Sequence, residues 1–310
     1  LIVISKKNFD KLFKENHLIA LKILSSVSRL ISRRMSVTTN QVAGVQAQYV
    51  SSKTRHEHDL LGDREVPYEY YYGVQTLRWL ENFNITGIAI SHYPNLIKAL
   101  ALVKLAAAKA NYKLGLLKDD VFNAMCKACE EIASGRYHAH FVVDMIQGGA
   151  GTSTNMNANE VIANRSLEIM GYQKGEYEYC HPNNHVNMSQ STNDAYPTAL
   201  KLSLIYENQS LIAVLKELID SIYKKSKEFS NVIKMGRTQL QDAVPMTLGQ
   251  EFEAFAVTLE EEILRLEENS KLFYEINMGG TAIGTGINAE PNYSEYCTEY
   301  MREVTGLPFV

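Results

Sequence analysis

Residues 189–198 concentrate side chains that can bind a small anion. Ser189, Ser191, Thr192 and Asn193 lie within five positions, just before a long helical pattern begins. Such hydroxyl and amide side chains cap helix N-termini, because their oxygen atoms accept hydrogen bonds from free backbone N–H groups. The same end of a helix attracts anions. The segment therefore predicts a helix start and suggests one wall of a carboxylate site.

Two further polar segments have a similar character. Residues 147–160 hold three glycines in four positions, followed by hydroxyl and amide side chains that lead into a helix. This segment is neither a P-loop nor a dinucleotide fingerprint, because it lacks Gly-Lys-Ser/Thr and no strand–helix–strand unit surrounds it. Composition alone leaves a carboxylate-binding loop and a plain turn equally open. Residues 234–247 form a long polar connection between helical patterns, which is usually functional in a bundle.

Metal and redox chemistry are not favoured. His56 and His58 stand among acidic residues, but positions two apart share a face only on a strand, and no third ligand is evident. We interpret this segment as solvated or hydrogen-bonded and predict no metal site. Cys126 and Cys129 form a Cys-x-x-Cys pair inside a helical pattern, without a second pair, which favours reduced thiols. This usage fits a reducing cytoplasm.

The composition is that of an ordinary globular protein. The chain has 310 residues, 45% hydrophobic and 21% charged, with a formal net charge of -4. It is long enough for one large or two medium domains. The charge balance favours neither nucleic acid nor an anionic membrane as a partner. No apolar run approaches the roughly 20 residues that span a bilayer, and the richest, 96–110, carries three lysines.

Helical periodicity accounts for most of the chain. Apolar spacing predicts helices over 95–114 and 119–133, with Gly135 in the C′ position of the second. After residue 198, one wide stripe predicts a helix of roughly 30 residues. A second stripe over 252–276 predicts its antiparallel partner, and we expect both stripes to form the core of a bundle.

The N-terminal segment has a different character. Residues 1–35 combine a short apolar run with an amphipathic helical pattern, and this order resembles the C-terminal end of a cyclic-nucleotide-binding domain, without its phosphate-binding loop. An amphipathic helix packed on another segment is the alternative. Residues 36–54 are small and polar, which is typical of a linker. The chain begins with Leu1 and ends on apolar residues, so we expect a fragment at both ends.

Beyond the linker, the polar segments together resemble signature regions of the aspartase/fumarase superfamily. The resemblance runs from about Arg55 to Val310, and its signature stretches are 57–87, 148–160, 189–198, 236–247 and 280–286. It implies a mainly α, fumarase/aspartase-like fold. In that fold a mixed, helical lyase N-terminal domain over 55–188 precedes a partial central long-helix bundle over 189–310.

Details within these stretches favour the aspartase branch. Thr192 stands where fumarases typically have Ser, Gln239 stands where they usually have His, and 171–177 is also aspartase-like. The segment 181–183 departs from this and is more similar to the fumarase version. The resemblance implies an ammonia-lyase that reversibly eliminates ammonia from L-aspartate to give fumarate. Fumarate hydratase is the first alternative, and a non-catalytic regulatory or binding homologue is an alternative of another class.

The resemblance assigns substrate binding to neutral hydrogen-bonding side chains: Thr152, Ser191, Thr192, Asn193 and Thr238. Gln239, Asn155 and Asn157 are expected to support them. Removing a proton beside a carboxylate adds negative charge to that carboxylate, and oriented neutral donors can strengthen their bonds as the charge develops. We therefore expect no required cofactor, and the resemblance adds Mg²⁺ as an activator.

The catalytic base is not assigned. In the family it is a serine on a mobile Gly-Ser-Ser loop, and the chain contains no such run, so we place this loop beyond residue 310. We expect the 310-residue chain alone to show no lyase activity. Because the family builds each site from three subunits of a homotetramer, the expected partners are L-aspartate or fumarate and further copies of the protein. Neither nucleic acid nor a membrane is expected.

Overall fold

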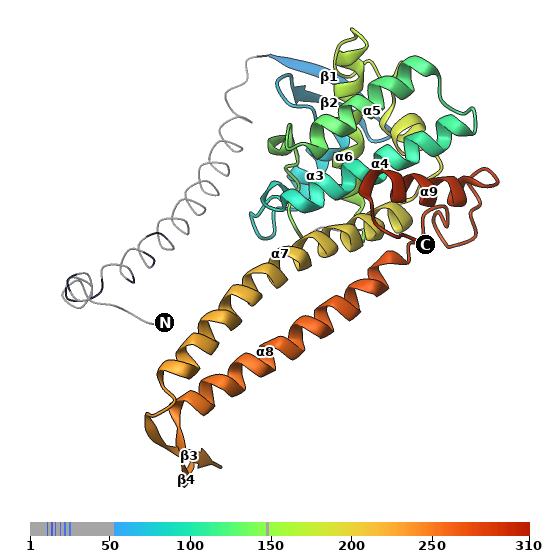
Figure 1. Ribbon diagram of the computed structural model, residues 1–310. Coiled ribbons are helices and arrows are strands. Elements are labelled where there is room, and N and C mark those ends of the chain that lie inside the picture. Colours follow the sequence, from blue (N-terminus) through green and yellow to red (C-terminus); the bar gives the residue numbers. More distant parts are fainter. Residues whose placement is uncertain are drawn as a thin grey trace.

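The computed structural model describes residues 53–146 and 149–310, together with six single positions between 11 and 25. A helical body carries a projecting pair of long helices, α7 (Thr192–Glu228) and α8 (Leu248–Ser270) (Figure 1). The predicted cyclic-nucleotide-binding remnant, 1–35, and the predicted linker, 36–54, lie almost wholly outside the described residues. The expectation of a mainly α fold is confirmed.

The body begins with an antiparallel ribbon formed by β1 (Thr54–Asp59) and β2 (Gly62–Pro67). His56 and His58 share one face of β1. Their Nδ1 atoms lie 3.1 Å and 2.7 Å from carboxylate oxygens of Glu65 and Asp63 across the ribbon. The prediction of a hydrogen-bonded segment is therefore confirmed, in the form of a strand. Within 53–146 and 149–310, no three His, Cys, Asp or Glu side chains are grouped so that they could hold a metal ion.

Two of the predicted helices have almost the expected bounds. They are α4 (Pro94–Lys113) and α5 (Asp119–Ala133). Pro94 begins α4, where its missing N–H would have had no intrahelical partner. Gly135 follows the end of α5 with a φ of 102°, the left-handed conformation predicted for it. All four cysteines are free, which includes Cys126 and Cys129, the pair expected to be reduced.

Helix α6 (Thr152–Ile169) is the buried centre of the body. Its polar side chains bind the backbone of the segments around it. Asn164 donates from Nδ2 to the carbonyl oxygen of Tyr71 at 2.8 Å and accepts at Oδ1 from the backbone N–H of Gly175 at 2.8 Å. A helix with this polar face can be fully buried because the surrounding loops satisfy it.

Two buried carboxylates cap the start of α3 (Val74–Asn82). Glu160 of α6 accepts from the backbone N–H of Gly73 at 2.8 Å, and Glu57 of β1 accepts from that of Val74 at 2.8 Å. Burial, and then the nearby Glu57, raises the pKa of Glu160 to about 7. A Cβ atom on Gly73 would lie 2.5 Å from the hydroxyl oxygen of Tyr177, so only glycine fits between these groups.

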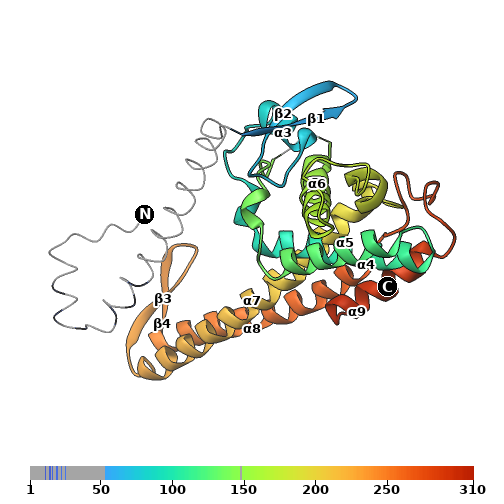
Figure 2. The ribbon, with the colours of Figure 1, turned by 90° about the horizontal axis from the view of Figure 1, so that it is seen from above.

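The long helices are joined by β3 (Ile233–Thr238) and β4 (Gln241–Thr247), which pair antiparallel. The polar connection predicted over 234–247 is therefore a hairpin and not a loop. Figures 1 and 2 both place it at the end of α7 and α8 farthest from the body. After α8, the chain returns to the body through η4 (Lys271–Tyr274) and ends with α9 (Tyr293–Thr305), which packs against α4.

One hydrophobic core joins α4, α5, α6, the first turns of α7 and α9. The domain division predicted at residue 188 stays a prediction. A second, small hydrophobic cluster lies between α7 and α8, and its buried members are Ile219, Ala256 and Ile263.

The expectation that both apolar stripes are core is wrong for much of α7 and α8, because side chains such as Leu211 and Phe255 are exposed. Two helices can cover only one side of each other. No helix in the described part of the chain is both long and apolar enough to cross a membrane.

Candidate active site

The starts of α6 and α7 meet inside the body. Gly151 caps α6 with a φ of 103°, and a Cβ atom there would lie 2.2 Å from the ring of Tyr196 on α7. Only glycine allows this approach, which places Thr152, the first residue of α6, beside the first turn of α7. Asn155 of α6 donates from Nδ2 to the hydroxyl oxygen of Thr192 at 3.2 Å. We call this contact region between the N-termini of α6 and α7 the junction.

Ser191 begins α7 with a capping box. Its hydroxyl oxygen accepts from the backbone N–H of Asn193 at 3.2 Å, and Asp194 accepts from the backbone N–H of Ser191 at 2.8 Å. The second carboxylate oxygen of Asp194 accepts from the backbone N–H of Thr281 at 2.8 Å. Burial raises the pKa of Asp194, while these donors act in the opposite direction. The cap thereby links the helix start to the glycine-rich loop 279–286.

A proline in the second turn of α7 strengthens this link. Pro197 has no N–H to offer the carbonyl oxygen of Asn193, four residues earlier. The side-chain amide of Asn277 donates to that oxygen instead, at 3.0 Å. The side chain of Asn193 donates in turn to the carbonyl oxygen of Ala282 at 2.8 Å. The exposed Asn193 is therefore held through its backbone and its side chain by residues 277 and 282, just before and within the glycine-rich loop.

The hydroxyl groups at this junction are suited to a carboxylate ligand. The oxygens of Ser191 and Thr192 accept hydrogen bonds from the protein, which leaves the hydrogen of each hydroxyl to donate. Thr152 is half-buried and donates to the carbonyl oxygen of Gly149 at 2.6 Å, so it must rotate to donate to a ligand. Residues 147 and 148, which begin the predicted glycine loop, lie outside the described residues.

Three of the predicted site residues are placed elsewhere. Asn157 is buried, and its amide binds the backbone at Val142 and His140, at 2.9 Å and 3.0 Å, so it holds that segment and not the junction. Thr238 and Gln239 are exposed at the hairpin turn, where Gln239 has a φ of 50°. The 37-residue helix α7, about 55 Å long at 1.5 Å per residue, lies between them and Thr192.

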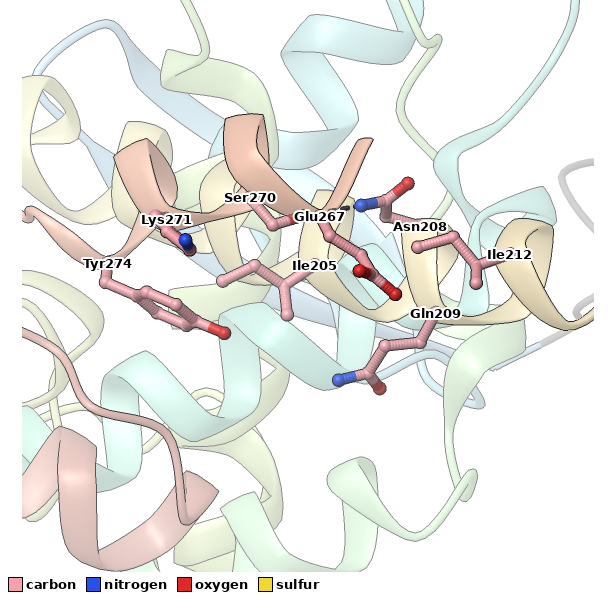
Figure 3. A pocket seen from close by; sticks show the side chains of 8 residues that line it. All are labelled: Ile205, Asn208, Gln209, Ile212, Glu267, Ser270, Lys271 and Tyr274. Carbon is pink, nitrogen blue, oxygen red and sulfur yellow. Dashed lines mark hydrogen bonds between the residues drawn. The ribbon is translucent and has the colours of Figure 1, made fainter. Parts of the chain in front are cut away.

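A separate cavity of about 400 Å³ lies between α7 and the end of α8. Figure 3 shows its lining side chains, which include Asn208, Gln209, Glu267 and Lys271. Asn208 donates to the carbonyl oxygen of Leu266 at 3.0 Å, so part of this polar lining joins the two helices. The cavity contains none of the predicted site residues.

A family model described as lyase matches residues 62–310, most of the chain. The chain belongs to this lyase family. The predicted membership of the aspartase/fumarase superfamily is confirmed.

Relatives of this lyase chain carry aspartase and fumarase names. An aspartate ammonia-lyase from Pseudomonas canavaninivorans is 59% identical over 257 residues, 83% of this chain and 54% of the relative. A fumarate lyase:delta crystallin from Brucella melitensis, solved bound to cobalt, has a TM-score of 0.80 at 53% identity, covering 83% of this chain and 56% of that one. A class II fumarase from Schistosoma mansoni has a TM-score of 0.75 at 37% identity, covering 82% and 53%. The chain spans about half the length of these proteins.

Sequence reasoning missed one prominent residue beside the candidate site. Lys104 of α4 is fully buried beneath the junction, and it was not among the predicted site residues. A signal was present in the spacing. Lys98 and Lys109 are 11 residues apart and share a helix face within about 20°, whereas Lys104 lies about 120° away among apolar neighbours. Asn187 and Asp194, which approach Lys104, were also absent from the predicted site.

Proposed function

We propose that the full-length protein is an aspartate ammonia-lyase, which reversibly eliminates ammonia from L-aspartate to give fumarate. The observation that carries the proposal is the Asn155–Thr192 hydrogen bond, since it brings two helix starts and their neutral donors together. Relatives named aspartate ammonia-lyase, at 50–59% identity, support this reaction over the other lyase reactions. The proposed reaction makes the protein a carbon–nitrogen lyase that acts on a small molecule.

The arrangement of donors explains how such a site favours elimination. Helix N-termini attract a carboxylate, and the hydroxyls of Ser191 and Thr192 can donate to its oxygens. Proton removal at the adjacent carbon increases the charge on those oxygens. Neutral donors gain most from that increase, so they bind the transition state more tightly than the substrate. Losing one oriented donor in such sites costs about 10²- to 10³-fold in kcat.

We also propose that the protein acts as a homotetramer with shared sites. Two features support this. Thr238 and Gln239 lie far from Thr192 in the same chain, so they can take part in binding only at another copy's helix starts. The exposed apolar side chains along α7 and α8, such as Leu211 and Phe255, need further helices to cover them.

An assay of the full-length protein tests the function. We expect fumarate to form from L-aspartate, followed by ultraviolet absorbance, with little turnover of L-malate. Turnover of L-malate alone would establish the fumarase alternative, and turnover of neither would favour a non-catalytic homologue. Thr192→Val should lower kcat by about 10²-fold. Activation by Mg²⁺ stays a prediction, tested by adding a chelator to the same assay, and the cytoplasmic location also stays a prediction.

A further inference from the structure

We propose that Lys104 is a positioning residue of this site, because it fixes the direction of a hydrogen-bond chain that ends at the Thr192 hydroxyl. The proposal rests on the function proposed above and deepens it. Lys104 does not touch the helix starts. It acts through two side-chain amides that lie between α4 and the junction.

The chain of hydrogen bonds begins at the buried ammonium. The Nζ atom of Lys104 donates to Oδ1 of Asn187 and to Oε1 of Gln190, both at 2.9 Å. An ammonium can only donate, so both amide oxygens must face it. The amide nitrogen of Gln190 then donates to the carbonyl oxygens of Val186 and Met188, at 3.0 Å and 3.1 Å. The amide nitrogen of Asn187 likewise donates to the carbonyl oxygen of Gln190 at 3.3 Å, so Lys104 and these backbone carbonyls together orient both amides.

Asn155 carries this orientation to the site. The Oδ1 atom of Asn187 also accepts from Nδ2 of Asn155 at 3.1 Å, and the same nitrogen donates its second hydrogen to the hydroxyl oxygen of Thr192 at 3.2 Å. If the Asn155 amide turned over, its oxygen would face the oxygen of Asn187. Thr192 is therefore held as an acceptor from the protein, and its hydrogen is directed to a ligand.

The side-chain oxygen of Asn155 indicates that neighbouring residues, and not Asn155 itself, determine the orientation of its amide. Asn155 is 1% exposed, and its Oδ1 atom has no hydrogen-bond partner among the described residues. Leaving a buried carbonyl oxygen unpaired is unfavourable. The amide nonetheless keeps both hydrogens on Asn187 and Thr192. The partners that Lys104 orients determine this arrangement.

The charge on Lys104 is sensitive to its surroundings. The groups that face it are Asp194 from α7, Cys129 from α5 and Cys297 from α9. Burial lowers the pKa of Lys104 to about 7, and Asp194 acts in the opposite direction. A neutral amine can accept as well as donate, so above this pH Lys104 no longer requires both amide oxygens to face it, and only the backbone carbonyls still hold the amide nitrogens.

The test compares Lys104→Met with the unsubstituted full-length enzyme. We expect the variant to keep its circular dichroism spectrum and oligomeric state, with a higher KM for L-aspartate, a lower kcat and about tenfold lower kcat/KM. Lys104→Gln, which retains N–H donors, should recover part of this loss. The matched control is Lys109→Met in the same helix, because Lys109 pairs with Glu303 at the surface; its kcat/KM should stay within twofold.

The pH profile separates positioning from mere packing. The ratio of unsubstituted to Lys104→Met kcat/KM should fall as the pH rises above about 7, since the unsubstituted enzyme then loses its ammonium. A purely structural role gives a constant ratio. A constant ratio between pH 6 and 9, or a kcat/KM of Lys104→Met within twofold of the unsubstituted value, overturns the proposal.

Two further measurements keep the proposal testable. If Lys104→Met does not fold, Asn187→Leu removes the shared acceptor while Gln190 still pairs with Lys104; the same rise in KM is expected, and unchanged constants overturn the proposal. If the unsubstituted protein forms no fumarate, the proposed function fails separately. The side-chain amide NMR signals of Asn155 then decide, because they should shift in Lys104→Met, and unchanged signals reject the positioning role.

Discussion

A carboxylate oxygen of Asp194 lies 2.8 Å from the backbone nitrogen of Thr281 and accepts its hydrogen bond. The other carboxylate oxygen accepts from the backbone N–H of Ser191. One buried side chain thus fixes the start of α7 to a loop 87 residues farther along the chain. The glycine-rich loop 279–286 is therefore part of the candidate site's support, although none of its residues was predicted to bind substrate.

Asp194→Asn should destabilise the protein. An amide offers one acceptor oxygen where two backbone N–H groups need acceptors, and it leaves Lys104 without its nearby negative charge. We expect a loss of about 1–3 kcal/mol in the free energy of unfolding, measured by urea denaturation. Asp220→Asn, exposed on the same helix, is the control and should change stability by less than about 0.5 kcal/mol. Equal effects of the two variants would contradict the role of Asp194.

Gly73→Ala should be destabilising through lack of space. The φ of Gly73 is -114°, so strain in the backbone is not the cause, and the new Cβ atom would meet the Tyr177 hydroxyl at 2.5 Å. We expect a cost of about 1–3 kcal/mol. In a double-mutant cycle, Tyr177→Phe should recover part of this cost, because it removes the nearest atom.

Gly115→Ala is the control for that cycle. Gly115 has a φ of 75° and no atom within 4 Å of the added Cβ, so its cost comes from backbone conformation alone. It should show no coupling to Tyr177→Phe. Strict additivity of Gly73→Ala and Tyr177→Phe would reject the steric explanation.

Stability should depend on pH through Glu160. The pKa of this carboxyl is raised from 4.5 to about 7, mainly by burial. Between these values the folded protein keeps a proton that the unfolded chain has lost. The contribution of Glu160 to stability is therefore full below about pH 4.5 and is lost as the pH rises to about 7. The free energy of unfolding of the unsubstituted protein, minus that of Glu160→Gln, should fall from pH 5 to 7.

A surface carboxylate provides the control for this pH effect. Glu268→Gln, exposed on α8, should leave the pH dependence of unfolding unchanged. A difference between the unsubstituted protein and Glu160→Gln that rises between pH 5 and 7 would show that Glu160 is ionised in the folded protein.

Co-expression of two impaired variants should restore part of the lost activity. Thr192→Val changes the first residue of α7, and Thr238→Val changes a residue beyond its other end, about 55 Å along the helix axis. If each site takes these residues from different copies, co-expressed full-length variants form some sites with both threonines intact. Random mixing leaves about one quarter of the sites complete. Activity that stays at the level of the separate variants would show that both residues serve a site within one chain.

Local sequence determined the helices and their caps. The bounds of α5 match the prediction because apolar spacing, acidic residues in the first turn and Gly135 act within a few residues of one another. The capping role of Ser191 was predicted for the same reason, since its acceptor oxygen lies two residues from the N–H that it binds. The sequence also showed that the polar segments at the N-termini of α6 and α7 lead into helices.

Tertiary structure decided which of these segments meet. Strand pairing within 233–247 depends on contacts between two separate stretches, so the sequence predicted a polar connection there but not its hairpin. The burial of Lys104 depends on which helices cover α4, although its spacing carried a hint. Above all, the sequence predicted a site shared between subunits, but only the tertiary structure shows that the length of α7 separates Thr192 from Thr238 within one chain. A helix start can be specified by its neighbours in sequence, but a site made from several helices depends on packing across the whole molecule.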